Sequence, residues 1–405
     1  MSEWKKVKLV DICDIRSGKR LPKGTDFSTV PTNYKYIRAR DIKNGIINGE
    51  NLAYITKDVK DKISNYIVNA NDIAITIVGA SVGDVAYVSP EFDGINLTEN
   101  AVRLTNFKDN TNPRFIFYIL NSPEYYLLMQ QIAGGAAQPK MGIYKVEAIE
   151  VCIPSIFDQN RIVDILSRYD SLVENYQKQI KLLEEAAQRL YKEWFVDLRF
   201  PGHENTKIVD GVPEGWEKNC IAELGTVITG KTPSTSKREN YGGSIPFITI
   251  PDMHSGIFPV SSQFLSDIGA NSQKGKFIPA DSLMVSCIGT AGLVCISSRT
   301  CQTNQQINSL VLHDKRFLYF LYYAFLMLKE HLNNIGSNGA TMTNVNKSKF
   351  ESISLLIPTG NLISLYNDKA KPYFKNIRQL SSQIRHLTEA RDRLLPKLMS
   401  GEIAV

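Results

Sequence analysis

The stretch WKKVKLVDICDIRSGK, residues 4–19, decides the fold because it returns in the second half of the chain as WEKNCIAELGTVITGK, residues 216–231. Both copies begin with tryptophan and end with the dipeptide Gly-Lys. Self-similarity at one long spacing is typical of a chain built from a repeated structural unit. We therefore expect one unit that is used twice within the 405 residues.

The similarity continues in the same order through the rest of each half. The matched segments are KYIRARDIKNGI (35–46) with PFITIPDMHSGI (246–257), NDIAITIVGASVGDV (71–85) with ADSLMVSCIGTAGLV (280–294), GGAAQPKM (134–141) with NGATMTNV (338–345), and VCIP (151–154) with LLIP (355–358). This alignment places Asp41 opposite Asp252, Asp72 opposite Asp281 and Gly83 opposite Gly292. The number of residues that separates matched segments changes little along the chain, so the two halves differ by small changes in loop length.

Each unit continues as a predicted long helix. Apolar residues recur at alternating spacings of four and three from Ile162 to Trp194, and again from Tyr366 to Leu398 with Arg391 as the polar exception. Such a seam buries a narrow stripe against another helix. Pro372 is expected to kink the second helix or to delay its start. The predicted interface residues are Tyr169, Tyr176, Ile180, Leu183, Leu190 and Trp194 in the first helix and Tyr373, Ile377, Leu380, Ile384, Leu387 and Leu394 in the second.

The globular halves combine strands with single buried helices. Short β-branched runs closed by glycine, such as IAITIVG (73–79) and LMVSCIG (283–289), predict strands. The apolar segments 115–132 and 316–332 predict one amphipathic helix per half. We divide the chain into a first globular domain (1–155), a first long helix (156–200), a Gly- and Pro-rich linker (201–215), a second globular domain (216–358) and a second long helix (359–405).

Composition is that of a soluble globular protein, with 43% hydrophobic and 22% charged residues. The first residues lack the apolar run of a signal peptide, and the apolar stretch Phe317–Leu328 is too short to span a bilayer. We therefore predict a cytoplasmic protein without a membrane segment. The net charge of +6 is compatible with an anionic partner.

The cysteines and histidines do not predict a metal or catalytic site. The six cysteines form no Cys-x-x-Cys pair, and the five histidines are isolated from them and from one another. This pattern favours reduced, mostly buried cysteines.

One segment matches a nucleotide-binding motif. GTVITGKT, residues 225–232, fits the phosphate-binding loop GxxxxGK[ST]. In a true case a helix follows directly, whereas here Pro233 follows and no helical pattern is present. The matching segment CDIRSGKR (13–20) lacks the first glycine and the final threonine. We expect instead a tight turn that presents a cation, and we keep a nucleotide hydrolase that uses this loop as an alternative.

Several paired loops carry side chains suited to DNA. RARDIK (38–43) and TIPDMH (249–254) follow predicted strands at equivalent places, and NLTEN (96–100) corresponds to the amide-rich TNQQIN (303–308). Arginine can pair with guanine through two hydrogen bonds, and Asn or Gln with adenine. The paired pattern favours sequence-specific DNA binding over catalysis. A scaffold whose coiled coil is its main purpose remains a further alternative.

Taken in this order and repeated twice, these features resemble the specificity (S) subunit of type I DNA restriction–modification enzymes. The resemblance rests on PEGW (213–216), the two Gly-Lys dipeptides, the strand-Gly segments around Gly83 and Gly292, and the IP endings at Pro154 and Pro358, each followed by a long helix. It covers nearly the whole chain. The first copy departs from the pattern because Trp4 lacks the Pro-x-Gly lead-in.

The resemblance implies an α+β fold with two β-rich target-recognition domains and two long antiparallel helices that form a coiled coil, related by an internal pseudo-twofold repeat. It implies a non-catalytic subunit that reads a bipartite, asymmetric double-stranded DNA target, one half-site per domain. Two methyltransferase subunits, which carry S-adenosylmethionine and methylate adenine, would dock on the helices. ATP and Mg would belong to a restriction subunit where one is present, and this chain would hold no cofactor itself.

The residues expected at DNA follow from the paired loops. They are Lys19, Arg20, Arg38, Arg40 and Lys140 in the first domain and Lys231, Thr232, Asp252, His254, Gln305, Gln306 and Thr343 in the second. Lys19, Arg20 and Lys231 are expected to position phosphates. Arg38, Arg40, Asp252, His254 and the two glutamines are expected to reach base edges.

Overall fold

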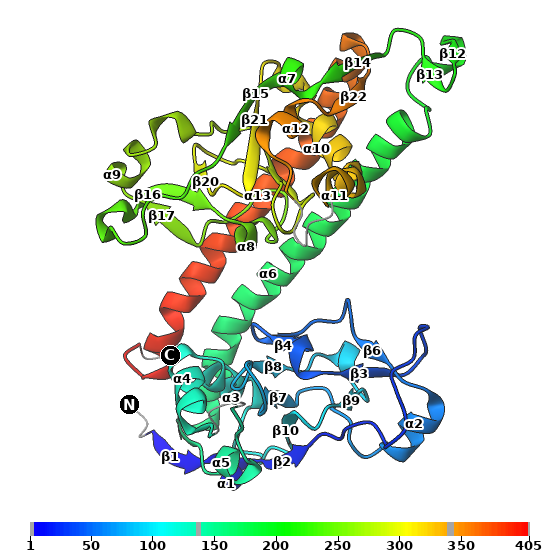
Figure 1. Cartoon of the computed structure of the whole chain (residues 1–405). Helices are drawn as coiled ribbons and strands as arrows, with labels where there is room; N and C mark the ends of the chain where they lie inside the picture. Colours follow the sequence, from blue (N-terminus) through cyan, green and yellow to red (C-terminus); the bar gives the residue numbers. More distant parts are fainter. Residues whose placement is uncertain (1–3, 135–138, 338–343, 404–405) are drawn as a thin grey trace. The chain divides into compact units, whose positions relative to one another are not determined.

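The computed structural model describes residues 4–134, 139–337 and 344–403. It divides into two compact units, one made of residues 1–172 and 387–405 and the other of residues 173–386. Each unit combines a globular part with segments of the two long helices, α6 (Ile156–Tyr191) and α13 (Gly360–Met399) (Figure 1).

The first unit is built around a four-stranded antiparallel sheet in the order β2-β10-β7-β8. Its strands are β2 (Asp14–Ser17), β10 (Ala101–Thr105), β7 (Ile73–Thr76) and β8 (Val85–Tyr87). The helix α3 (Pro113–Leu120) contacts β8, and its residues from Phe115 to Leu120 are all buried. Further elements are β1 (Lys5–Lys8), α1 (Leu9–Ile12), β3 (Lys35–Ile37), β4 (Ile42–Lys43), β5 (Ile46–Ile47), β6 (Ala53–Tyr54), α2 (Lys57–Lys62), β9 (Asn96–Leu97), α4 (Pro123–Ile132), α5 (Ile143–Glu147) and β11 (Glu150–Ile153).

The second unit repeats this topology. Its four-stranded sheet has the order β15-β21-β18-β19, again antiparallel throughout. The strands are β15 (Gly225–Thr229), β21 (Ile307–Leu312), β18 (Leu283–Ser286) and β19 (Val294–Ile296), with α10 (Leu318–Met327) in the place of α3. Further elements are β14 (Glu217–Cys220), α7 (Ile221–Leu224), β16 (Tyr241–Ile248), α8 (Ile250–Met253), β17 (Gln263–Leu265), α9 (Asp267–Asn271), β20 (Gln302–Thr303), α11 (Lys329–Ser337), α12 (Lys347–Glu351) and β22 (Ser354–Ile357), and β12 (Ile208–Val209) and β13 (Val212–Pro213) form a hairpin ahead of them. The repeat predicted from the sequence is confirmed.

A smaller three-stranded sheet is also repeated. β3 pairs antiparallel with β6 and parallel with β9, while β16 pairs antiparallel with β17 and parallel with β20. In both units the strand that pairs in parallel, β9 or β20, is followed directly by a strand of the four-stranded sheet, β10 or β21. The loop between them therefore stands at the junction of the two sheets.

The sequence alignment of the repeats is wrong by one residue at the start of β7 and β18. It places Asp72 opposite Asp281, but the strands begin at Ile73 and Leu283, which makes Asn71 the counterpart of Asp281. Asn71 and Asp281 share a left-handed backbone, with φ of 72° and 61°. The turn from Gly289 to Gly292 is one residue shorter than the turn from Gly79 to Gly83, so the alignment recovers beyond it.

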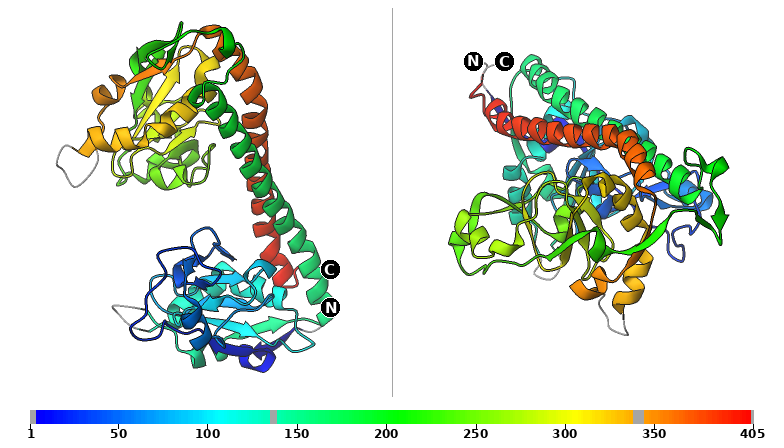
Figure 2. Two further views of the ribbon diagram at one scale, coloured as in Figure 1. Left: turned by 90° about the vertical axis from the view of Figure 1, so that its right-hand side faces the viewer. Right: turned by 90° about the horizontal axis from the view of Figure 1, so that it is seen from above.

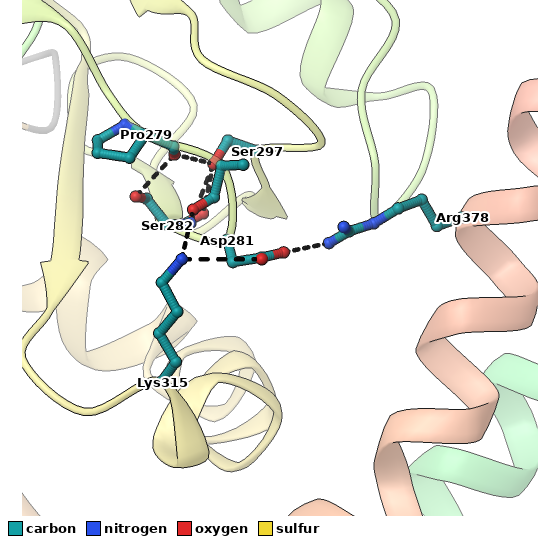
Figure 3. Close-up of polar contacts among 7 residues, drawn as sticks. Pro279, Asp281, Ser282, Ser297, Lys315 and Arg378 are labelled. Carbon is teal, nitrogen blue, oxygen red and sulfur yellow. Dashed lines mark hydrogen bonds and ion pairs between the residues drawn. The ribbon is translucent and has the colours of Figure 1, made fainter.

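Asp281 links the globular part of the second unit to α13. Its carboxylate pairs with the guanidinium of Arg378 on α13 and lies 3.9 Å from the Lys315 ammonium (Figure 3). Arg378 also lies over the ring of Phe258, 4.6 Å from its centre. In the first unit, Asn71 instead accepts a hydrogen bond from the Tyr87 hydroxyl at 2.8 Å. The side chains at this matched position therefore have different partners, a residue of α13 in the second unit and a residue of β8 in the first.

The two long helices run antiparallel in each unit. In the first unit, Asp170 of α6 pairs with Arg391 near the end of α13, and Ile162 and Leu166 share a core with Leu398. In the second unit, Tyr191 near the end of α6 packs on Tyr366 near the start of α13. Figures 1 and 2 show the helices side by side. The helix α13 begins at Gly360, so the expectation that Pro372 delays its start is wrong.

Arg391, the polar exception in the seam, belongs to a half-buried ionic network in the first unit. Its guanidinium lies 2.8 Å from Asp170, which also accepts from the Tyr118 hydroxyl at 2.5 Å and from Arg114 at 3.5 Å. The Asp170 side chain is 13% exposed. The network joins α3, α6 and α13, because its members come from all three helices.

The second unit fills the corresponding place with apolar side chains. By the repeat spacing, Phe374 corresponds to Asp170 and Ala187 to Arg391. Phe374 stacks on Tyr319 with ring centres 4.3 Å apart, and Phe374 and Ala187 are both fully buried. A polar network and an aromatic stack thus occupy equivalent positions of the two units.

The cysteines differ in exposure, which gives a direct check on the fold. Burial raises the pKa of the thiols of Cys13, Cys287, Cys295 and Cys301 to about 12. Cys152 is exposed and Cys220 is half-buried. Since the thiolate is the reactive form, we expect iodoacetamide at pH 8 to label only Cys152 and Cys220 in the folded chain. Intact mass spectrometry before and after unfolding checks this, and rapid labelling of a buried thiol in the folded chain would contradict the packing.

Candidate nucleic-acid interface

The two Gly-Lys dipeptides lie at the edge of the four-stranded sheet, at equivalent places. Gly18 donates to the carbonyl of Ala101, and Lys19 donates to that of Leu97. Gly230 and Lys231 repeat this pattern with Ile307 and Thr303. The shared hydrogen bonds fix the same register in both units.

The expected tight turn at these dipeptides is wrong. Gly18 and Gly230 do not adopt positive φ values. They are glycines because a Cβ atom would stand 2.1 Å from the carbonyl oxygen of Thr98 or Asn304, respectively. The close approach of two backbones, and not a turn, requires glycine here.

The first five residues of the GTVITGKT motif form an extended strand. Gly225–Thr229 is β15, which pairs along its length with β21. A phosphate-binding loop wraps its backbone around the phosphate and leads into a helix. Here Gly230 is held against the backbone of Asn304, and the first helical turn beyond is the short 3₁₀ turn Arg238–Asn240.

In the first unit, the dipeptide is followed by an ion pair between distant parts of the chain. The Arg20 Nε donates to Glu99 Oε1 at 3.1 Å, and the Arg20 side chain is 78% exposed. Lys19 is exposed with its ammonium 5.4 Å from the centre of the Tyr66 ring. The Tyr36 hydroxyl donates to the Lys19 carbonyl at 2.6 Å, and burial raises the pKa of Tyr36 to about 12.

In the second unit, the corresponding side chains form a neutral pair. The Thr232 hydroxyl donates to Gln305 Oε1 at 2.7 Å. Gln305 is exposed, while Gln306 is half-buried and hydrogen-bonded to Asn304 and to the carbonyl of Ile288. The structure therefore brings together Lys231, Thr232 and the two glutamines, four of the residues predicted from the sequence.

Asp41 and Asp252 are buried and hydrogen-bonded within the protein. Asp252 is buried, and its carboxylate accepts from the Thr249 N–H and hydroxyl at 2.8 Å and from the Ser262 N–H at 2.9 Å. Asp41 accepts the backbone N–H of Arg38 in the same manner. Both close a short helical turn as capping residues. Because these internal partners occupy both carboxylate oxygens of Asp252, we no longer assign it to a base edge.

Arg38 is also occupied within the protein. Its guanidinium makes two hydrogen bonds to Asp41, at 2.9 and 2.8 Å, and a third to the carbonyl of Asn51. The side chain is only 19% exposed. Its donors hold the turn in place, so Arg38 is no longer among the residues that we assign to bases.

Arg40 and His254 are exposed on the turns that these aspartates hold. Each turn adjoins the loop discussed above, because the Ile37 carbonyl accepts from Thr98 and the Ile248 carbonyl accepts from Asn304. Within each unit, the turn, the Gly-Lys dipeptide and the amide-bearing loop therefore form one continuous surface. We call it the reader surface, centred on Lys19, Arg20, Arg40 and Glu99 in the first unit and on Lys231, Thr232, His254, Gln305 and Gln306 in the second.

Lys140 lies near the reader surface of the first unit. It forms a backbone bridge with Val78 and is exposed, and the neighbouring Ile77 donates to the Asn100 carbonyl. Thr343, the residue expected at DNA in the matching segment of the second unit, lies outside the described residues.

Glu99 was missed from the sequence as a site residue. It is 79 positions from Arg20, and no local pattern marks it. The only signal was its place in NLTEN, the segment paired with the amide-rich TNQQIN.

The predicted helix interface is only partly buried along most of its length. Trp194 and Ile377 are buried at 7% and 1% exposure. The other predicted residues are half-buried: Tyr169, Tyr176, Ile180, Leu183, Leu190, Tyr373, Leu380, Ile384, Leu387 and Leu394. A seam between only two helices leaves its edges open to other contacts.

The described residues contain neither a metal-binding cluster nor a membrane-spanning helix. No group of three or more His, Cys, Asp and Glu side chains in these ranges is placed to hold a metal ion. No helix in the same ranges has the length and apolar character needed to cross a membrane.

Comparison with known proteins gives consistent matches over the whole chain. The model of the type I restriction modification DNA specificity domain matches residues 1–185 and 213–361. The HindI type I restriction enzyme specificity subunit of Haemophilus influenzae is 30% identical, with both chains covered completely. The MjaIX specificity subunit of Methanocaldococcus jannaschii is 26% identical over 82% of this chain and 78% of its own. The crystal structure of the type I S subunit from M. genitalium shares the fold, with a TM-score of 0.62, 16% identity, and coverage of 98% of this chain and 96% of that one.

Proposed function

Because the chain belongs to the type I restriction modification DNA specificity family, we propose that its two units read the two halves of a bipartite, asymmetric DNA target. The observation that carries the proposal is the contrast within the repeat. The sheet order, the glycines and the capping aspartates are the same in both units. The exposed side chains of the two reader surfaces differ, as Arg20 and Glu99 do from Thr232 and Gln305.

The chemistry of each reader surface suits double-stranded DNA. Exposed cations at Lys19 and Lys231 stand beside side chains that offer several hydrogen bonds. In protein–DNA complexes, contacts of cationic side chains with phosphates fix the position of the protein on the DNA. Side chains that enter the grooves read the base sequence. We assign Lys19 and Lys231 to phosphates, together with Lys140 of the first unit.

We further propose that the chain is not catalytic and acts through partners. Two copies of one helix present similar faces to two copies of a methyltransferase subunit, which would hold S-adenosylmethionine. A restriction subunit, where present, would supply the ATP- and Mg-dependent activity. Exposed apolar residues along the helices, such as Leu182 at 65% and Leu365 at 51%, support docking there.

Reconstitution with a candidate methyltransferase subunit tests the proposal. We expect methylation of mixed DNA to be confined to one motif when the chain is present. Equal modification of random DNA would favour a scaffold instead. ATP turnover by the isolated chain that is lost in Lys231→Ala would favour a nucleotide hydrolase.

Replacing Arg40 by alanine is expected to relax one half-site and leave the other unchanged. Arg40 is exposed on the turn of the first reader surface, and loss of a good base contact costs about 1–3 kcal/mol of discrimination. Mapping of methylated sites in the reconstituted complex measures this. Arg16→Ala is the control, since Arg16 is exposed on β2 and paired with Asp14. An unchanged motif would remove Arg40 from the reader surface.

A further inference from the structure

We infer that Arg20, held by Glu99, selects guanine in one half-site and that Gln305, held by Thr232, selects adenine in the other. The inference rests on the proposed function and deepens it, since it names the base read at one position of each reader surface. It also moves Arg20 from phosphates, where the sequence placed it, to a base edge.

The two side-chain pairs occupy the same place in the two units. The hydrogen bonds of Gly18 and Lys19 to Ala101 and Leu97 match those of Gly230 and Lys231 to Ile307 and Thr303. Arg20 follows Lys19 as Thr232 follows Lys231. Glu99 lies two residues after Leu97, as Gln305 lies two residues after Thr303. Each pair therefore joins the same two backbone positions of the repeated scaffold.

Arg20 has the donors that guanine requires. Its Nε donates to Glu99, and within the described ranges its two Nη groups donate no hydrogen bond to the protein. Guanine presents two acceptors, O6 and N7, in the major groove, and a guanidinium offers paired donors to them. Glu99 is a positioning residue: it is 31% exposed, and its second oxygen accepts from the Thr98 hydroxyl at 3.2 Å.

Gln305 has one donor and one acceptor, as adenine requires. Thr232 donates to Oε1, which keeps a second lone pair, and Nε2 has no partner among the described residues. Adenine presents the N6 donor and the N7 acceptor side by side. The Thr232 hydroxyl holds the amide at its Oε1 end, which leaves the Nε2 end to donate to a base. Thr232 is therefore the positioning residue of this pair.

Neither pair is explained by stability alone. The exposed ion pair of Arg20 is of a kind that stabilises a fold little, since solvent screens it and side-chain order opposes it. The Thr232–Gln305 hydrogen bond also lies at the surface of the protein and not in its core. Fixing a side chain before binding lowers the entropy that recognition must overcome. Orientation for a ligand therefore accounts for both contacts better than stabilisation.

Exchanging the pairs between the units provides the sharpest test. In the full chain reconstituted with its methyltransferase, T232R/Q305E transfers the Arg–Glu pair to the second unit. One adenine of the second half-site is then expected to become guanine, with the first half-site unchanged. The reciprocal R20T/E99Q is expected to convert one guanine of the first half-site to adenine. Each change is expected to shift base preference by about 5- to 150-fold, as for one paired base contact.

Two control variants are included, and the wild-type complex is also tested on modified DNA, so that every outcome supports or overturns the inference. R16Q and Q263A alter exposed residues of the same types away from the pairs, on β2 and β17, and are expected to leave the motif unchanged. Should an exchanged variant lose all methylation, the wild-type complex is tested on DNA carrying 7-deazaguanine or 7-deazaadenine. Affinity is expected to fall at one guanine of the first half-site and one adenine of the second.

An exchanged variant that methylates the wild-type motif overturns the inference, and so does a wild-type complex indifferent to every 7-deazapurine. Both results leave the proposed function intact. A wild-type motif that is not bipartite would instead overturn the proposed function itself, so the two failures are distinguishable.

Discussion

Replacing Asp170 by alanine is expected to lower the free energy of unfolding of the first unit by about 2–3 kcal/mol. Removing one partner of a buried ion pair costs roughly 3–5 kcal/mol, because the other charge is left unpaired in a poorly solvated place. The expected loss is smaller here because Arg391 and Arg114 keep 29% and 30% of their side chains exposed. Asp170 serves both arginines and the Tyr118 hydroxyl, so its loss disconnects α3, α6 and α13 together.

Chemical denaturation with urea, monitored by circular dichroism, measures this loss. Asp392→Ala is the matched control, since Asp392 also pairs with Arg391 at 2.8 Å but is 57% exposed. Exposed ion pairs contribute about 0–1 kcal/mol, so the control is expected to change little. Equal losses in the two variants would show that the network contributes no more than a surface contact.

The aromatic stack of the second unit suggests how the loss can be recovered. Phe374 and Ala187 occupy the places of Asp170 and Arg391, and Tyr319 of α10 stacks on Phe374 as Arg114 of α3 pairs with Asp170. The triple variant R114Y/D170F/R391A is expected to regain most of the stability lost in Asp170→Ala, since apolar replacements of buried ion pairs are often neutral. A triple variant less stable than Asp170→Ala would contradict the equivalence of these positions.

Gly230→Ala is expected to lower the free energy of unfolding by about 3 kcal/mol and to abolish reading of the second half-site. The new Cβ would lie 2.1 Å from the Asn304 carbonyl oxygen and 2.3 Å from that of Thr303. Overpacking of this kind costs roughly 1–3 kcal/mol, and backbone on both sides leaves little room to relax. The strand must then separate from the loop that carries Gln305.

Thermal unfolding and mapping of methylated sites measure the two effects of this variant. Gly275→Ala is the control, because its Cβ would meet nothing within 4 Å. Gly18→Ala is expected to affect the first half-site in the same way, with the second retained. Normal reading of both half-sites in Gly230→Ala would show that the close backbone approach does not position the reader surface.

Much of the scaffold could be predicted from the sequence because some backbone conformations and contacts accept only particular residue types. The close approach at Gly18 and Gly230 and the caps at Asp41 and Asp252 recur at matched positions. The one-residue error at Asp281 arose because a shortened turn shifts a strand without changing its apolar character. Apolar runs fix the presence of a strand better than its register.

The reader surface was harder to predict because residue type does not separate a binding side chain from a capping one. Asp252 and Arg38 are polar residues in a loop, yet both are held by local hydrogen bonds. Thr249-x-x-Asp252 carries the signature of a capping box, which would have marked Asp252 as structural. Glu99 needed the three-dimensional pairing with Arg20, which sequence spacing does not reveal.

Sequencing of methylated genomic DNA from cells that express the wild-type chain with its methyltransferase tests the central claim most directly. We predict one interrupted motif whose two halves differ, since the same scaffold carries Arg20 and Glu99 in one unit and Thr232 and Gln305 in the other. A continuous motif, or two halves that are inverted copies of each other, would contradict the account.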